Sequence, residues 1–338
     1  MKKQNCLLID AIHITMGGGR VLLEYLCESL ASISVPFVLL RDSRCKTLAN
    51  INDEIVLSGE MERRRFYKKN RNTYSAVFCF ANIPPTVSLT CPVYTYFHNI
   101  NLLRIPESFS LKRHLVTLLK RIYIYTFSKN TSSWIVQTSN TENCLRNVLP
   151  CKGKDVKIYP FYRSLKLDDQ TDISGIIPKD YVLIGDYTGT RGHDELLDAW
   201  KVLSDSGYSF TLHMTVARDN PFSERIEAYR SRGVKVVNHG IVSHEMVKRL
   251  YKMSKATVYP SMNESLGLGI IEAIEAGCDV IGADLPYLHS ICVPSVMFEK
   301  VSPKDIANAV IQYEKNAFPK SKLIISNRID DLLTYILR

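Results

Sequence analysis

Two glutamates on either side of a glycine-rich turn are the residues whose types and spacing most clearly permit chemistry. Glu264 and Glu272 stand eight positions apart, and the turn between them carries Gly267 and Gly269. A helix-forming run, residues 270–276, follows the turn directly. The spacing predicts that Glu264 lies in the loop before this helix and that Glu272 lies about one turn inside it.

The start of such a helix is an anion site. Gly267 and Gly269 have no Cβ, so the backbone there is free to approach a ligand closely. The amides of Leu268 and Gly269, together with the positive end of the helix dipole, attract phosphate. The two carboxylates would then accept hydrogen bonds from hydroxyl groups on either side of the phosphate. A diphosphate joined to two sugars, one of them a ribose, has this layout, so the pattern predicts a nucleotide-sugar site.

A plainer interpretation is a buried strand, a glycine turn and a core helix with two surface glutamates. The flanking sequence favours the ligand site, because residues 256–259 and 279–283 both have the composition of short buried strands. A strand–loop–helix–strand order places the loop at the carboxyl edge of a parallel sheet, where ligands of such sheets bind.

The stretch from residue 259 to residue 277 resembles the Glu-x7-Glu signature of retaining glycosyltransferases with the GT-B fold, especially family four, the glycosyl transferases group 1. Residues 181–200 and 234–251 resemble the units that precede this signature in the family. The resemblance covers residues 181–310 strongly and the first half of the chain more loosely. It implies an α/β fold of the GT-B type, with two Rossmann-like domains that face a central cleft.

An alternating strand–helix rhythm also indicates parallel sheets with helices on both faces. We expect strands at 6–12, 35–40, 75–80, 93–97 and 133–137, and then from 181 and at 209–216, 234–237, 256–259 and 280–283.

The predicted domains are 1–160, on the acceptor side, and 181–318, which binds the nucleotide-sugar. A linker or hinge at 161–180 joins them. By the resemblance, a C-terminal helix within 319–338 packs back toward the hinge.

The resemblance also assigns a cation to the diphosphate. Arg191 stands where the family usually carries a Lys that binds this group, and a guanidinium suits phosphate oxygens. The family often has an Arg after the first strand of this domain, where the chain has Asp186. The sequence leaves open whether Arg218 or Lys255 supplies the missing cation.

The first half of the chain has a glycine-rich loop, residues 16–20, between a strand and an expected helix at 21–30. Gly18 and Gly19 are predicted to approach the diphosphate, with plain turn glycines as the alternative. A Rossmann dinucleotide site with Asp42 as its acidic residue is disfavoured, because Leu22 stands where the third glycine of that motif belongs.

His98 follows the expected strand at 93–97. By the resemblance, a histidine at this place reaches the transferred sugar, and an ordinary polar residue at a strand end is the alternative.

Together these residues predict a sugar transferase, and the resemblance implies that it retains the anomeric configuration. Arg191 and the amides of Leu268 and Gly269 would stabilise the leaving diphosphate, Glu272 would bind the ribose hydroxyls, and Glu264 would orient the donor sugar. The expected acceptor is a hydroxyl of a glycan, lipid-linked as in the synthesis of bacterial surface polysaccharides (O-antigen, capsule or lipopolysaccharide).

Other functions remain as alternatives. A GT-B protein that has lost turnover would act as a scaffold or binding protein, and a nucleotide-sugar epimerase shares the fold. A glycoside hydrolase needs two carboxylates that flank the scissile bond, and the sequence assigns no such pair.

The net charge of +9 is concentrated in the first half, where residues 1–160 hold 22 Lys and Arg against 11 Asp and Glu. Two basic segments, 63–71 and 111–125, account for much of this excess, and the second mixes basic and apolar residues at helical spacing. An anionic membrane surface would suit these segments. The alternative for the second segment is a solvated helix with one face in the core. Nucleic acid is not expected, because no recognition motif accompanies the charge.

The remaining composition indicates a cytoplasmic enzyme, with peripheral association at the inner face of the cell membrane. No apolar run reaches the roughly 18 residues of a membrane span. Nine scattered cysteines without a Cys-x2-Cys pair fit reduced thiols better than disulfides or a zinc site. We expect no metal and no cofactor beyond the nucleotide-sugar donor itself.

Overall fold

The chain divides into two compact units in a computed structural model that describes residues 6–49, 51, 53–106, 109–165 and 178–338. The first unit consists of Met1–Arg163 and Ser326–Arg338, and the second of Ser164–Ile325. The first boundary thus falls three residues after the predicted one, and the chain rejoins the first unit at Ser326 rather than at 319. Most of the predicted linker lies outside the described residues.

The first unit contains a seven-stranded parallel sheet in the order β3-β2-β1-β4-β5-β6-β7. The five strands expected here are present, whereas β3 and β7 were not predicted. Both additions are short outer strands with a charged first residue. The strands are β1 Leu7–Ala11, β2 Phe37–Asp42, β3 Glu54–Leu57, β4 Ala76–Cys79, β5 Val93–Phe97, β6 Ser133–Val136 and β7 Asp155–Ile158.

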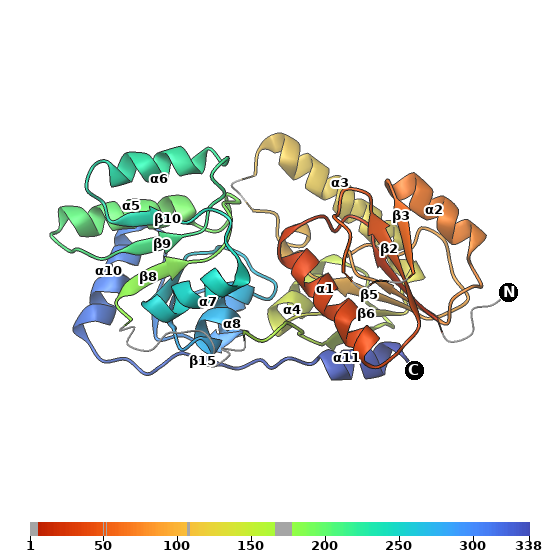
Figure 1. Cartoon of the computed structure of the whole chain (residues 1–338). Coiled ribbons are helices and arrows are strands. Elements are labelled where there is room, and N and C mark those ends of the chain that lie inside the picture. The colour runs from red at the N-terminus through yellow and green to blue at the C-terminus, as the bar shows by residue number, and fades with distance from the viewer. Residues whose placement is uncertain (1–5, 50, 52, 107–108, 166–177) are drawn as a thin grey trace. The chain divides into compact units, whose positions relative to one another are not determined.

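Five α-helices belong to this unit among the described residues: α1 Gly17–Ser32, α2 Glu60–Lys69, α3 Leu111–Phe127, α4 Ser139–Val148 and α11 Ile329–Ile336 (Figure 1). The last of these is the predicted C-terminal helix. The chain is fixed at its entry, where the amide of Arg328 donates to the carbonyl of Pro160 at 2.7 Å, and the hydroxyl of Tyr335 bonds to that of Ser133 at 3.0 Å.

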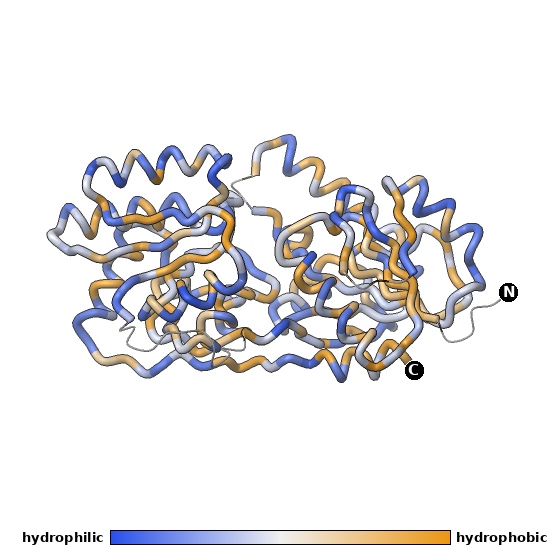
Figure 2. Tube along the Cα trace, in the orientation of Figure 1, coloured by the Kyte–Doolittle hydropathy of each residue, from blue (hydrophilic) through white to orange (hydrophobic). Residues whose placement is uncertain are grey.

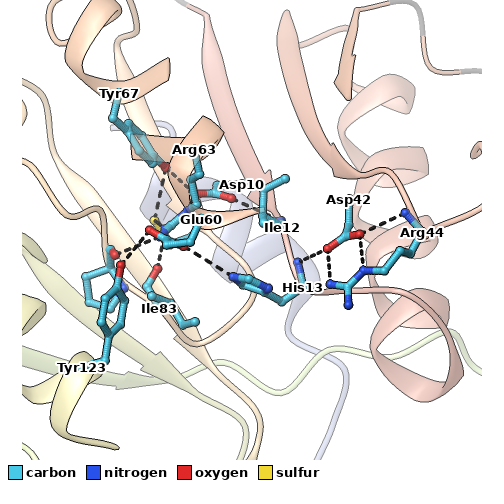
Figure 3. Close-up of polar contacts among 12 residues, drawn as sticks. Asp10, Ile12, His13, Asp42, Arg44, Glu60, Arg63, Tyr67, Ile83 and Tyr123 are labelled. Atoms are coloured by element: carbon cyan, nitrogen blue, oxygen red, sulfur yellow. Dashed lines mark hydrogen bonds and ion pairs between the residues drawn. The ribbon is translucent and has the colours of Figure 1, made fainter. Parts of the chain in front are cut away.

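A buried ion pair holds α2 against this sheet. Arg63 is 2% exposed and Asp10, on β1, is 1% exposed, and their side chains meet at 2.6 Å. The hydroxyl of Tyr67 donates to the same Asp10 oxygen, and Glu60 contacts the Arg63 guanidinium at its outer side (Figure 3). Arg63 was expected to be part of a membrane-facing basic segment, and that expectation is wrong because its charge is consumed inside the unit.

The second basic segment forms α3, which is exposed along most of its length. Only Thr117 and Ile124 are buried. The guanidinium of Arg121 donates to the carbonyls of Leu102 and Leu103 at 2.8 Å and so ties the helix to that segment. Hydrophobic and hydrophilic residues follow one another along it (Figure 2). None of the helices described is both long and apolar enough to cross a bilayer.

The second unit contains a six-stranded parallel sheet in the order β10-β9-β8-β11-β12-β14. All five expected strands are present, and β14 was not predicted. A two-stranded antiparallel sheet, β13 with β15, accompanies it. The strands are β8 Asp180–Leu183, β9 Leu212–Met214, β10 Val236–Asn238, β11 Ser254–Tyr259, β12 Asp279–Ala283, β13 Cys292–Val293, β14 Val296–Phe298 and β15 Lys322–Leu323.

Helices cover both faces of the six-stranded sheet. Helix α10 packs against α5, and α6 lies beside β10, whereas α7 and α8 pack on β11 from the other side (Figure 1). Val182, Tyr251 and Ala273 form part of the core between the sheet and α7 and α8. The helices are α5 His193–Asp205, α6 Phe222–Arg230, α7 His244–Met253, α8 Leu268–Glu275, α9 Pro286–His289 and α10 Pro303–Lys315.

Candidate functional site

Two loops at the carboxyl edge of the second sheet touch at Gly192. This residue has a φ of +67° and forms the N-cap of α5. A Cβ built on it would lie 2.5 Å from the carbonyl oxygen of Pro260, in the loop after β11. The amide of Met262 donates to the carbonyl of Thr190 at 3.1 Å and joins the same two loops. Only glycine combines this backbone conformation with so close an approach.

The joined loops bring Arg191 beside Glu264. The Nε atom of Arg191 lies 3.7 Å from Oε1 of Glu264, and the two side chains are 35% and 14% exposed. The guanidinium lies over the bare Cα of Gly185, at the end of β8, where a Cβ would collide with it. A partly exposed cation and a carboxylate therefore stand next to each other at the edge where the sequence predicted a ligand.

Glu264 is held by its own loop and strand. The hydroxyl of Ser261 donates to Oε1 at 2.9 Å, and that of the buried Tyr259 donates to the same oxygen at 3.1 Å. Ser261 is itself fixed, because its carbonyl accepts a hydrogen bond from Tyr287 at 2.7 Å. The orientation of the carboxylate is thus set before any ligand arrives.

Helix α8 begins at Leu268, two residues before the run at 270–276 that the sequence indicated. Gly267 is its N-cap, with a φ of +65°. Leu268 and Gly269 are the first two helical residues, so their amides lack partners within the helix and are available to an anion. Gly269 also has a packing role that the sequence did not predict. A Cβ there would lie 3.2 Å from the ring of Tyr259 and 3.4 Å from the hydroxyl of Tyr251.

Glu272 is the fifth residue of α8, about one turn from the helix start. Burial raises its pKa to about 7, and the neighbouring Glu275 adds to the shift. The hydrogen bond assigned to Tyr251 opposes it. A carboxyl group in this state is close to half-ionised at neutral pH, which suits a partner that offers hydroxyl groups rather than a cation.

The three residues expected to act from the first half lie in the first unit. Helix α1 begins at Gly17, not at 21, so Gly18 and Gly19 form its first turn. Met16 has an extended backbone and is the N-cap of α1, so the helix begins directly after it. A Cβ built on Gly19 would lie 3.3 Å from Cε1 of His98, so these two predicted residues adjoin.

His98 is enclosed by aromatic rings. It stacks on Tyr96 with ring centres 5.7 Å apart and leans on Phe80 at 5.3 Å. Burial lowers the pKa of His98 to about 4, so the imidazole is neutral at physiological pH. Its backbone amide donates to the side chain of Asn82 at 2.7 Å. A neutral, positioned imidazole is suited to hydrogen bonding rather than to carrying charge.

The predicted residues therefore form two groups. Six residues of the second unit surround the start of α8, and three of the first unit surround the start of α1. Sequence reasoning missed Tyr259, Ser261 and Tyr251, which hold the glutamates and the helix start. The only signal for one of them was that Tyr259 is the first residue of the motif. In the described part of the chain, no three His, Cys, Asp or Glu side chains gather as a metal site would require.

Comparison with known proteins assigns the second unit. Residues 174–330 match the family described as glycosyl transferases group 1. The match covers most of the second unit and less than half of the whole chain, and it supports a group 1 glycosyltransferase. The chain is 28% identical over 152 residues to the serotype-specific mannosyltransferase WbdA of Escherichia coli. The matched region is 43% of this chain and 19% of WbdA, so less than a fifth of that relative is represented here.

Solved structures extend the likeness to both units of the chain. Sucrose-phosphate synthase from Thermosynechococcus elongatus superimposes with a TM-score of 0.68 at 16% identity, over 93% of this chain and 90% of that one. The apo form of the lipopolysaccharide outer core galactosyltransferase WaaB gives 0.61 at 14% identity, over 91% and 89%. At such identities the likeness establishes the fold, and the predicted GT-B class is confirmed.

Replacing Gly192 with alanine tests the contact between the two loops of the second unit. The variant combines an unfavourable φ with a clash against Pro260, so we expect it to lose about 2–4 kcal/mol of unfolding free energy. Gly189 in the same loop has a φ of +70° and open space around it. Gly189→Ala should therefore lose only about 1 kcal/mol. Equal losses in urea denaturation would show that the contact contributes nothing.

The raised pKa of Glu272 predicts a pH-dependent stability difference. Between about pH 4.5 and 7, Glu272 keeps its proton in the folded state but has lost it in the unfolded state. The free energy of unfolding therefore falls as pH rises through this range. Glu272→Gln removes that loss and should raise Tm at pH 8 by on the order of a few degrees, with little effect at pH 5. The exposed Glu299, changed to Gln, serves as the control. A difference that does not vary with pH would contradict the assignment.

Proposed function

We propose that this protein is a retaining glycosyltransferase that moves a sugar from a nucleoside-diphosphate sugar to a hydroxyl of a glycan acceptor. The observation that carries the proposal is the grouping of Arg191 and Glu264 at the start of α8, with Glu272 one turn inside it. The family match covers this same unit.

Each residue of the group has a task in that reaction. Cleavage of the sugar–phosphate bond leaves negative charge on the diphosphate, which Arg191 and the amides of Leu268 and Gly269 are suited to stabilise. Glu272 accepts hydrogen bonds from the ribose hydroxyls. Glu264 orients the donor sugar and faces the positive character that develops on it. The scheme assigns the charge of the leaving group to protein groups and includes no metal.

The first unit supplies the remaining roles. His98 is neutral and offers a hydrogen bond to the transferred sugar, while the first turn of α1 at Gly18 and Gly19 presents backbone amides to phosphate. Retention of the anomeric configuration follows if the acceptor hydroxyl attacks from the side that the diphosphate leaves.

Two other functions predict different outcomes when the protein meets a donor. A scaffold would bind the donor without releasing nucleotide, even with acceptor present. An epimerase would change the configuration of the sugar. The fixed orientation of Glu264 by Tyr259 and Ser261 favours turnover over a degenerate site.

Nucleotide release from UDP-, GDP- and ADP-sugars without acceptor tests the transferase proposal. We expect slow hydrolysis of one donor, and Glu264→Gln and Arg191→Ala should each reduce its rate about 100-fold or more. Glu299→Gln, on the surface of the same unit, should leave the rate unchanged. Release at the original rate in Glu264→Gln would contradict the role of that carboxylate. An epimerised sugar among the products would favour the epimerase.

We further propose that the acceptor is lipid-linked and that α3 docks the enzyme on an anionic membrane surface. WbdA is named a serotype-specific mannosyltransferase and WaaB a lipopolysaccharide outer core galactosyltransferase, and these names support a role in surface polysaccharide synthesis. Apolar residues at every third or fourth position form one stripe on α3, and this stripe faces solvent: Leu111 (87% exposed), Leu115 (56%), Leu118, Ile122 (54%) and Tyr125.

The charge beside the stripe supports this partner. Lys112, Arg113 and Lys120 are exposed on the same helix, and their long stems let the charged ends reach lipid head groups while the apolar stripe enters the interface. The exposed cations of α2 add to the field, although Arg63 does not. Such an enzyme would be cytoplasmic and peripheral at the inner face of the membrane.

Sedimentation with lipid vesicles tests the role of α3. The wild-type protein should pellet with vesicles that contain phosphatidylglycerol and remain in solution with phosphatidylcholine alone, because each basic residue adds about 1 kcal/mol at an anionic surface. Replacing Leu115, Leu118 and Ile122 with Gln should abolish pelleting. Val293→Gln, at an equally exposed apolar residue of the second unit, is the control. Unchanged pelleting of the triple variant would contradict the proposal.

A further inference from the structure

Around the predicted diphosphate site, the residues described so far carry more negative than positive charge. Arg191 stands beside Glu264, and Asp186 is close enough to influence the Arg191 charge as well. One cation therefore serves two carboxylates before a ligand with two or more negative charges arrives. A diphosphate would bind weakly unless the same edge of the sheet provided a second cation.

Lys255 does not provide that cation. It is the second residue of β11, so it lies at the amino end of a strand whose carboxyl end leads to the site. Its ammonium pairs with Glu314 and lies 5.2 Å from the ring centre of Tyr181. Those partners occupy it at the opposite edge of the sheet.

Arg218 lies at the carboxyl edge. The loop after β9 is tied to the loop after β8, because the amide of Ala217 donates to Oδ1 of Asp186 at 3.1 Å and that of Gly185 donates to Thr215 at 2.8 Å. Arg218 is the next residue after Ala217. The carboxylate that adds negative charge near Arg191 therefore also fixes the start of the segment that carries Arg218.

The stem of Arg218 is placed by a glycine on the neighbouring strand end. A Cβ built on Gly240, just after β10, would lie 3.2 Å from Cγ of Arg218 and 3.3 Å from its Nε. Gly240 is buried with a φ of +73°, while Arg218 is exposed. Among the described residues Arg218 forms no ion pair, so its charge is not consumed by the fold.

We propose that Arg218 is the second cation of the donor site and contacts the diphosphate of the bound nucleotide. This inference rests on the proposed transferase function. Asp186 then has two opposing effects: it positions the Arg218 segment through Ala217, and it repels the ligand. Removing its charge while keeping its hydrogen bond should tighten binding.

Calorimetric titration with UDP, GDP and ADP, and with the corresponding monophosphates, tests the proposal. For the nucleotide that the wild-type protein binds, Arg218→Ala should weaken diphosphate binding about 10- to 100-fold, as expected for a lost charge-assisted hydrogen bond. Arg218→Lys keeps the charge but lacks the two parallel N–H donors of a guanidinium, so its affinity should lie between those of the wild type and Arg218→Ala. The monophosphate should lose less affinity than the diphosphate.

Two further variants separate binding from structure. Asp186→Asn retains an acceptor for Ala217 and should tighten diphosphate binding several-fold, whereas a purely structural role of this segment would weaken it. Arg232→Ala, an exposed arginine in the turn before β10, should bind as the wild type does. Equal diphosphate affinity in Arg218→Ala and the wild type would overturn the inference and leave the transferase proposal standing. If the wild type bound none of the nucleotides, the proposed function itself would fail and this inference with it.

Discussion

The contact between Gly192 and Pro260 is the constraint on which the second unit's site depends. It joins the loop after β8 to the loop after β11, and the partners that matter for chemistry, Arg191 and Glu264, lie directly beside the joint. A side chain at this glycine would collide with Pro260 and push apart the loops that carry Arg191 and Glu264. The positive φ of Gly192 and the absence of its Cβ are therefore requirements of the site and not only of the turn.

Around this joint the polar groups are oriented by side chains rather than by a ligand. Tyr259 and Ser261 hold the Glu264 carboxylate, while the absent Cβ of Gly269 lets α8 start against the Tyr259 ring. Preorganisation of this kind lowers the reorganisation needed when charge develops on a leaving group. Burial of Glu272, in contrast, lowers the stability of the folded state, because an ionised carboxylate is unfavourable at this buried position. The unit thus carries a destabilising group at the place where a ribose would bind, as functional sites often do.

The motif at 259–277 allowed the local geometry around the start of α8 to be predicted, because a Gly-rich turn, a helix start and two carboxylates at fixed spacing have local consequences. Features that depend on distant partners could not be predicted. The sequence predicts that Gly269 lacks a Cβ so that a ligand can approach, whereas a Cβ there would meet tyrosines from β11 and α7. Arg63 is one of several basic residues in a row, and only the fold shows that Asp10 consumes its charge. The strands that were missed, β3, β7 and β14, lie at the edges of their sheets, and none of them is buried along its whole length. They therefore lack the continuous apolar run that marks a fully buried strand.

The central claim is that the start of α8 and the loop before it form a nucleoside-diphosphate site. A crystal structure of the protein with the nucleoside diphosphate that it binds best tests this claim most directly. The account predicts the distal phosphate within hydrogen-bond distance of the Leu268 or Gly269 amide and of the Arg191 guanidinium, with the ribose hydroxyls on Glu272. A nucleotide bound elsewhere on the second unit, with the start of α8 unoccupied, would contradict it.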